Sequence, residues 1–157
     1  MTRHSGFTLI ELVITVAIVA MSATAAMPFV ELVVKRGKEQ ELHAALREIR
    51  QGIDAYKAAA DQGRIERKAD ESGYPPNLEV LVEGVEDATS PDHKMLFFMR
   101  RLPRDPFFPD GAAAPAAGWG LRSYVSPPEN PQAGEDVFDV YSLATGSALD
   151  GTLYRDW

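Results

Sequence analysis

The stretch HSGFTLIELVITVAIVAMSATAAMP, residues 4–28, decides the fold of this chain. It is almost continuously apolar and carries a single carboxylate, Glu11, near its start. Placing an ionised side chain at membrane depth costs at least about 2.5 kcal/mol. A plain membrane anchor would avoid this acid, so its presence needs a separate explanation.

The apolar pattern continues over residues 7–34, where Glu11, Pro28 and Glu31 are the only strongly disruptive residues. An α-helix rises 1.5 Å per residue, so this segment would extend over about 42 Å, more than the ~30 Å of bilayer hydrocarbon. We therefore predict a transmembrane helix here. Pro28 lacks a backbone donor, so we also expect a kink or a melted stretch near it.

Two ordinary interpretations of this segment leave Glu11 unexplained. Ala23-Thr24-Ala25 has the pattern of a signal-peptidase site and would favour a secretory signal peptide. The acid inside the apolar core, and the apolar pattern that continues past Ala25, count against it. A single-span anchor explains the length of the segment but gives Glu11 no role.

The unit GFTLIELV, residues 6–13, resembles the N-terminal motif of type IV prepilins and type II secretion pseudopilins. The resemblance implies that residues 1–6 are a leader, that a prepilin peptidase cuts between Gly6 and Phe7, and that the new N-terminal phenylalanine is methylated. In a filament, the amine of Phe7 in one subunit would lie beside Glu11 of a neighbour. Two charges that are each costly in lipid would then form a pair and fix the register. The alternative is that Glu11 reaches the lipid head groups.

Composition and motifs exclude several classes of function. The chain of 157 residues has a net charge of −7, which argues against nucleic acid as a partner. It has no cysteine, so disulfides, thiolate catalysis and cysteine zinc sites are excluded. The sequence also lacks G-x-S-x-G, Walker, G-x-G-x-x-G and H-E-x-x-H patterns, and we do not expect an enzyme.

Beyond the apolar segment, the helical pattern becomes amphipathic and continues to about residue 60. Apolar residues recur at spacings of three and four and define one face: Leu42, Ala45, Leu46, Ile49, Ile53 and Tyr56. We expect this face to pack on a small antiparallel sheet supplied by the second half of the chain. Its strands are predicted in WGLRSYVS (119–126) and DVFDVYSL (136–143), and a short helix is predicted in residues 73–84.

Other side chains of the second half receive ordinary structural roles. The predicted core includes Leu96, Phe97, Met99, Leu102, Trp119, Tyr124, Phe138 and Tyr141, whereas Arg100 and Arg101 are predicted to face solvent. Asp105-Pro106 is interpreted as a turn. His43 and His93 are far apart in sequence and are interpreted as surface residues.

The order of short motifs in the second half narrows the resemblance. Tyr74-Pro75, then RRLPRDPF (100–107), then DVFDVYSL resemble the major, G-type pseudopilin of type II secretion. The absence of cysteine favours this subfamily over major type IV pilins, which commonly close their C-terminal region with a disulfide. The implied fold is α+β, a pilin-like lollipop: a leader (1–6), a transmembrane or filament-core helix (7–34), and a periplasmic head that includes the amphipathic half of the helix (35–157).

The implied function is to polymerise into a periplasmic pseudopilus that drives protein export. The expected partners are further copies of the chain, prepilin peptidase, minor pseudopilins, and the inner-membrane assembly platform with its ATPase. The chain would cross the inner membrane once, with its head in the periplasm. Two alternatives stay open: a major or minor pilin of a type IV pilus, and a membrane-tethered periplasmic module whose head binds a ligand.

The resemblance also implies a calcium ion in the loop that follows the last strand, SLATGSALDGTLYRDW at residues 142–157. Calcium takes six to eight oxygen ligands. The candidate ligands are Leu143, Thr145, Ser147, Asp150 and Asp156, with the hydroxyl of Ser142 as an alternative to that of Ser147. Thr145-Gly146 stands where the family usually has a further acid, so a metal-free loop held by packing is the alternative.

Overall fold

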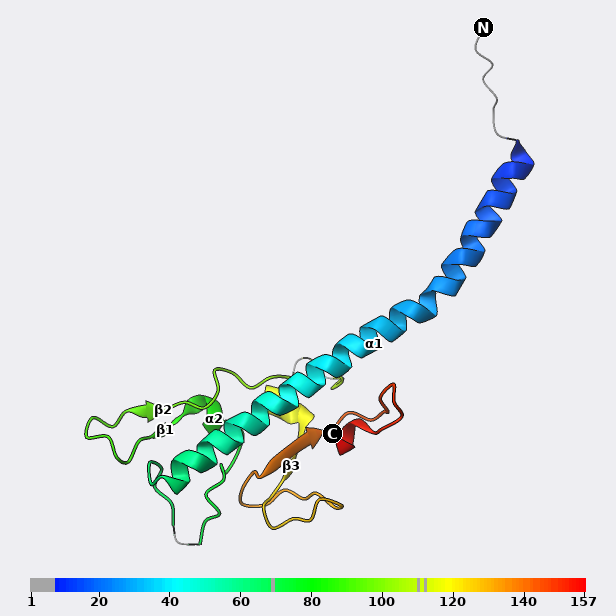
Figure 1. The fold of residues 1–157 in the computed structure, drawn as a ribbon. Coiled ribbons are helices and arrows are strands. Elements are labelled where there is room, and N and C mark those ends of the chain that lie inside the picture. The colour runs from blue at the N-terminus through cyan, green and yellow to red at the C-terminus, as the bar shows by residue number, and fades with distance from the viewer. Residues whose placement is uncertain (1–7, 69, 110, 112) are drawn as a thin grey trace. The chain divides into compact units, whose positions relative to one another are not determined.

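The computed structural model describes residues 8–68, 70–109, 111 and 113–157; the side chains of residues 24–28 lie outside this description. The chain divides into two compact units, Met1–Gly37 and Lys38–Trp157. Its elements are the helices α1 (Leu9–Asp61) and α2 (Val80–Glu83), the strands β1 (Val85–Glu86), β2 (Met95–Leu96), β3 (Trp119–Arg122) and β4 (Asp139–Ser142), and the 3-10 helices η1 (Pro115–Gly118) and η2 (Tyr154–Asp156) (Figure 1).

Helix α1 confirms the long helix predicted from the apolar periodicity. Thr8 caps its start, because the backbone N–H of Glu11 donates to the Thr8 hydroxyl at 3.3 Å. The helix continues through Pro28 without a break, so the melted stretch expected there does not occur. A proline removes one backbone hydrogen bond, and the long helical flanks maintain the rest. At the other end, Gly63 has φ +71°, a left-handed conformation that glycine adopts readily when it terminates a helix.

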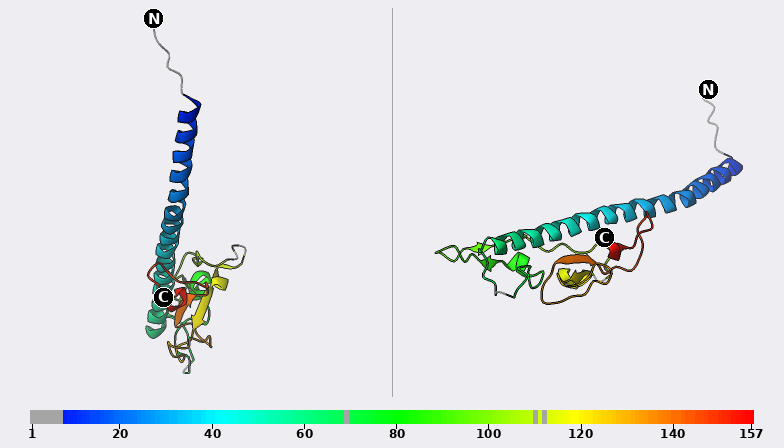
Figure 2. Two further views of the ribbon diagram at one scale, coloured as in Figure 1. Left: turned by 90° about the vertical axis from the view of Figure 1, so that its right-hand side faces the viewer. Right: turned by 60° about the horizontal axis from the view of Figure 1, so that its bottom comes forward.

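The core of the second unit lies along one face of the C-terminal part of α1. All six residues of the predicted apolar face are buried, and Leu42 and Ile49 expose none of their surface. The strands and loops of the second half lie on one side of this helical part (Figure 2). Gly52 lets the side chain of Met99 pack close to the helix backbone, because a Cβ at residue 52 would lie only 2.8 Å from Cγ of Met99. The fold is therefore α+β, with a long helix packed on small antiparallel sheets.

Two separate antiparallel pairs of strands make up the sheet structure. β3 and β4 pair with each other, as the sequence predicted, and the register places Trp119 opposite Ser142 and Leu121 opposite Val140. Both strands are shorter than predicted because the chain turns away after β3. The amide of Ser123 bonds the carbonyl of Gln132, and the Asp136 carboxylate accepts the Ser123 hydroxyl at 2.7 Å.

The second pair, β1 with β2, was not predicted. Val85 pairs with Leu96, and Glu86 pairs with Met95. Strands of two residues carry no readable alternation of apolar and polar side chains, so the pattern gave no signal. Asp87, which is buried, joins this hairpin to the segment after α1 through an ion pair with Arg64.

The prediction of a core position is wrong for Phe97 and Tyr124, and Asp105, predicted to lie in a turn, is also buried. Phe97 is 64% exposed, because Phe98 and Met99 provide the packing: Phe98 lies against Tyr56 and Met99 lies over the helix. Tyr124 is 59% exposed, since it lies in the loop after β3. Asp105 is buried and accepts a hydrogen bond from the hydroxyl of Ser142 on β4.

Candidate functional site

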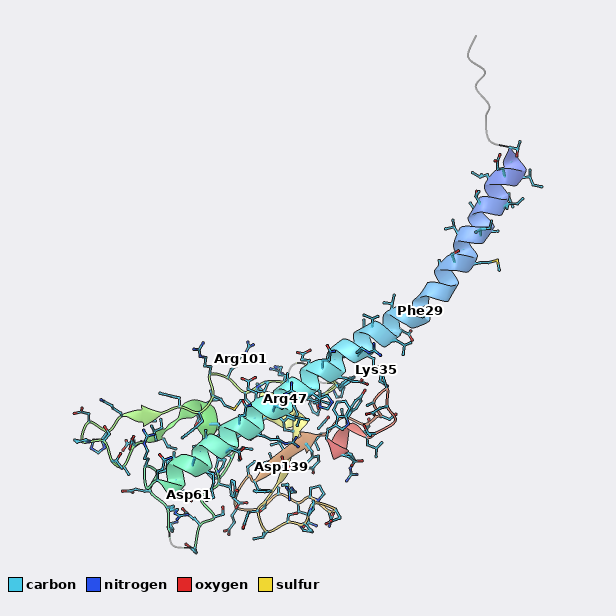
Figure 3. All side chains as sticks on the ribbon, in the orientation of Figure 1. Phe29, Lys35, Arg47, Asp61, Arg101 and Asp139 are labelled. Atoms are coloured by element: carbon cyan, nitrogen blue, oxygen red, sulfur yellow. The ribbon has the colours of Figure 1, made fainter. Side chains whose placement is uncertain are left out.

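The described part of the first unit exposes a long apolar surface. Its large apolar side chains each expose half or more of their surface, up to 81% for Leu9 (Figure 3): Leu9, Ile10, Leu12, Val13, Ile14, Val16, Ile18, Val19, Met21, Phe29, Val30, Leu32, Val33 and Val34. Exposed apolar surface of this extent marks a site of interaction with a membrane or with other protein chains. We call these residues the apolar segment.

Two described hydroxyls between the residues of the apolar segment are satisfied inside the helix. The hydroxyls of Thr15 and Ser22 donate to the carbonyl oxygens of Leu12 and Ile18, each at 2.9 Å. The Glu11 side chain is exposed, and no described residue donates a hydrogen bond to its carboxylate. Glu11 is thus a charge placed in an apolar surface with no described partner in its own chain.

The predicted processing site and membrane span are only partly covered by the described residues. Gly6 and Phe7 lie outside them, and so does the predicted leader. Within the part of the chain that the structure describes, no helix combines the length and the apolar character that crossing a membrane requires. The span proposed for residues 7–34 includes positions outside that part and stays a prediction.

The predicted calcium ligands lie in a loop that is closed by its own hydrogen bonds. Ser147 forms a bridge with Leu153, and Asp150 lies in the turn between them. Asp150 Oδ1 accepts the amide of Thr152 at 2.9 Å and its hydroxyl at 2.7 Å. The Thr152 hydroxyl, followed by the amide, lowers the pKa of the Asp150 carboxyl below its ordinary value. None of these contacts requires a cation.

The three other predicted ligands lie around this closed turn. Leu143 follows β4, and its amide donates to the carbonyl oxygen of Gly118 at 3.1 Å. Thr145 is exposed on the loop, and Asp156 lies in η2 with Oδ1 3.8 Å from Nε of Arg155. Among the described residues, no three His, Asp or Glu side chains gather into a group that could hold a metal ion. Calcium at this loop stays a prediction.

Three side chains of α1 contact the C-terminal loop, and sequence reasoning missed all three. Glu39 Oε1 accepts the amide of Leu149 at 2.9 Å and the hydroxyl of Tyr154 at 3.2 Å. Burial, followed by the Glu39 charge, raises the pKa of Tyr154 to about 12. A carboxylate on the helix therefore binds the loop at two points.

The other two contacts lie farther along the same helix. His43 stacks on Trp157 with ring centroids 3.9 Å apart and planes at 7°. Arg50 donates to Asp139 at 2.7 Å, to the Val140 carbonyl at 3.1 Å and to the Trp157 carbonyl at 2.7 Å. The spacing of residues 39, 43, 46 and 50 places all of them on one helical face, at the border of the buried stripe. Polar residues beside the buried stripe were the feature of the sequence that could have indicated these contacts.

A cavity of about 440 Å³ opens in the second unit near the end of α1. Tyr56 and Tyr74 contribute to its walls, together with the carboxylates of Glu66, Asp70, Glu71, Glu135 and Asp136. Neither His43 nor His93 is among the described residues of its lining.

The comparisons with known proteins reach only the start of the chain. Residues 1–27 match the family described as the prokaryotic N-terminal methylation motif. No curated protein and no solved structure matches the chain significantly. The matched residues include Gly6, Phe7 and Glu11, so the prepilin-like motif inferred from the sequence is confirmed. The chain thus carries a methylation motif of prokaryotic prepilin-like proteins on a long helix, in a fold consistent with pilins. The motif is typical of structural pilin-type subunits rather than enzymes.

Proposed function

We propose that this chain is a structural subunit that polymerises through its apolar segment into a periplasmic pseudopilus of a type II secretion system. One observation carries the proposal: the methylation motif at residues 1–27 includes the start of a helix, and the large apolar side chains of this part of the helix are exposed. In the monomer, lipid would cover this surface. In the filament, the same surface would contact the helices of neighbouring subunits.

The role of Glu11 follows from its surroundings. Cleavage between Gly6 and Phe7 would create an α-amino group, whose ordinary pKa lies near 8, so it is charged at neutral pH. The Glu11 carboxylate has no described partner within its own chain. Pairing it with the Phe7 amine of a neighbour neutralises both charges where each alone is costly. Because the pair forms at one relative position of two helices, it would also fix their register.

The finer assignment to type II secretion rests on the head. The chain has no cysteine, and the order of Tyr74-Pro75, RRLPRDPF and DVFDVYSL supports a major pseudopilin. Prepilin peptidase, minor pseudopilins and the inner-membrane platform with its ATPase are then the expected partners. A pilin of a type IV pilus is the second candidate, because the methylation motif supports it equally.

The proposal is tested by expressing the full chain in cells with a prepilin peptidase and determining its N-terminus by mass spectrometry. The expected mature chain begins at a methylated Phe7, and Gly6→Leu leaves the precursor uncut. A chain that begins at residue 26 or 27 would establish an ordinary signal peptide and overturn the proposal. In a deletion strain, loss of protein export identifies the pseudopilin, whereas loss of long surface fibres with export intact identifies the pilin.

A further inference from the structure

The C-terminal loop, residues 143–157, is held on α1 by Glu39, His43 and Arg50, which we call the helix latch. Glu39 and Arg50 are eleven residues apart, about 16 Å along the helix axis. Their contacts extend from the amide of Leu149 to the carbonyl of Trp157. The latch therefore holds most of the length of the loop, and not a single point.

The contact made by Glu39 serves two donors with one oxygen atom. Its Oε1 accepts from the Leu149 amide and from the Tyr154 hydroxyl, and Tyr154 is itself buried. Hydrogen bonds to a charged group are roughly twice as strong as those between neutral partners. The Glu39 carboxylate thus binds hydrogen-bond donors from two positions of the loop, Leu149 and Tyr154.

Arg50 and His43 hold the other end of the loop. The guanidinium of Arg50 joins the β4 backbone at Val140 to the Trp157 carbonyl, and its ion pair with Asp139 fixes its direction. The ring of His43 covers the indole of Trp157, whose N–H donates to the Thr152 hydroxyl at 2.7 Å. The Thr152 hydroxyl in turn donates to Asp150, so the turn and the end of the loop form one hydrogen-bonded chain.

The two carboxylates of this loop already face protein partners. Calcium takes six to eight oxygens, of which several are carboxylates. Asp150 directs Oδ1 toward Thr152, and Asp156 lies beside Arg155. In the ranges that the structure describes, no cluster of three acidic or histidine side chains is present at the loop or elsewhere. The carboxylate that contacts the loop comes from α1, and protein donors occupy Oε1 of Glu39.

We propose that the helix latch makes the order of the C-terminal loop independent of divalent cations, with Glu39 as the carboxylate that holds the loop through its hydrogen-bond donors. The loop is then coupled to α1 directly, and its order follows the integrity of the helix and not the calcium concentration. This inference concerns the monomer and goes beyond the polymerisation proposed above.

Hydrogen exchange measured by mass spectrometry on the full chain in detergent micelles tests the proposal. Peptides covering residues 143–157 are followed in 1 mM calcium chloride and in chelator. The wild-type chain is expected to exchange at equal rates in both, with equal thermal midpoints. Glu39→Ala is expected to accelerate exchange in these peptides by about tenfold, which corresponds to about 1.4 kcal/mol.

Matched variants separate the latch from general damage. Glu41→Ala alters an exposed acid two residues away and is expected to leave exchange unchanged. Glu39→Gln keeps an acceptor oxygen and is expected to restore part of the protection. The proposal is overturned if calcium slows exchange in the wild-type chain and Asp150→Asn abolishes that effect. It is also overturned if Glu39→Ala behaves like Glu41→Ala. Because micellar monomers are used, neither result depends on filament formation.

Discussion

The parts of α1 before and after residue 37 differ in the exposure of their apolar side chains. Before it, large apolar residues point in all directions and remain exposed, as at Val16, which is 60% exposed. After it, apolar residues occupy one stripe and are buried within the chain, as at Leu46, which is 1% exposed. The same secondary structure therefore serves two purposes. One part is complete within the chain, whereas the other requires surroundings that the chain does not provide.

Two carboxylates, one from each unit, differ in their partners. Asp87 in the second unit accepts hydrogen bonds from Thr89 and Arg64. Glu11 in the first unit has no described donor to its carboxylate. A charge without partners in its own chain is costly unless water or another molecule supplies them. The exposed Glu11 carboxylate is therefore consistent with the contact between subunits proposed above.

The largest expected effect is on stability, and it separates the two parts of the helix. Ile49→Ala should reduce the free energy of unfolding by about 2–5 kcal/mol, because it leaves a cavity at a fully buried position. Ile18→Ala removes the same three carbon atoms from an exposed position and should leave the head's unfolding midpoint unchanged. Denaturant unfolding of both variants in micelles measures the difference. Equal losses would show that the division into two kinds of burial is wrong.

The next effect is on assembly: a substitution in the first part of the helix should lower filament yield and leave the stability of the monomer unchanged. Glu11→Ala should be processed and fold normally, yet reduce filament yield at least tenfold, the change expected when about 1.4 kcal/mol of pairing is lost. Sheared filaments are quantified beside the thermal midpoint of the monomer. Glu11→Gln, which keeps the shape but not the charge, should behave like Glu11→Ala. Wild-type filament yield in either variant would refute the pairing of charges.

The smallest effect concerns the internal pairing of Asp87 and appears only in acid. Hydrogen bonds from Thr89, followed by those from Arg64, lower the pKa of Asp87 from 3.8 to about 2. The stabilisation is therefore fully present above pH 4 and is lost as the pH falls from about 4 to about 2. Asp87→Asn should flatten this part of the stability profile, whereas Asp92→Asn, at an exposed position of the same hairpin, should not. A wild-type acid profile in Asp87→Asn would contradict the assignment.

The helix and its buried stripe were predictable because periodicity reports them directly. Leu42, Ile49 and Tyr56 belong to a pattern that recurs over several turns, and all three are buried as predicted. The β1–β2 hairpin was not predictable, because its pairing depends on hydrogen bonds such as that from Asp87 N to Lys94 O and not on side-chain alternation. Phe97 was placed in the core on composition alone, without information on which way the chain turns.

The features of the candidate site also differ in how far they could be predicted from the sequence. The methylation motif is local in sequence, so GFTLIELV could be recognised without a structure, and the family match confirms it. The helix latch is not local: Glu39 and Leu149 are separated by 110 residues. No pattern within either segment encodes that contact. His43 was interpreted as an ordinary surface residue for the same reason, because its partner, Trp157, lies at the far end of the chain.

The hydroxyls of Thr15 and Ser22 have a mechanical consequence. Because both donate to carbonyls of their own helix, neither hydroxyl keeps a proton that it could donate to a neighbouring helix. If the chain polymerises as proposed, the described apolar segments would meet through dispersion contacts, which depend on close packing but single out no one pair of atoms. Such a fibre would resist stretching through the packing of its core, while its directional restraint would concentrate near the charged end of each helix.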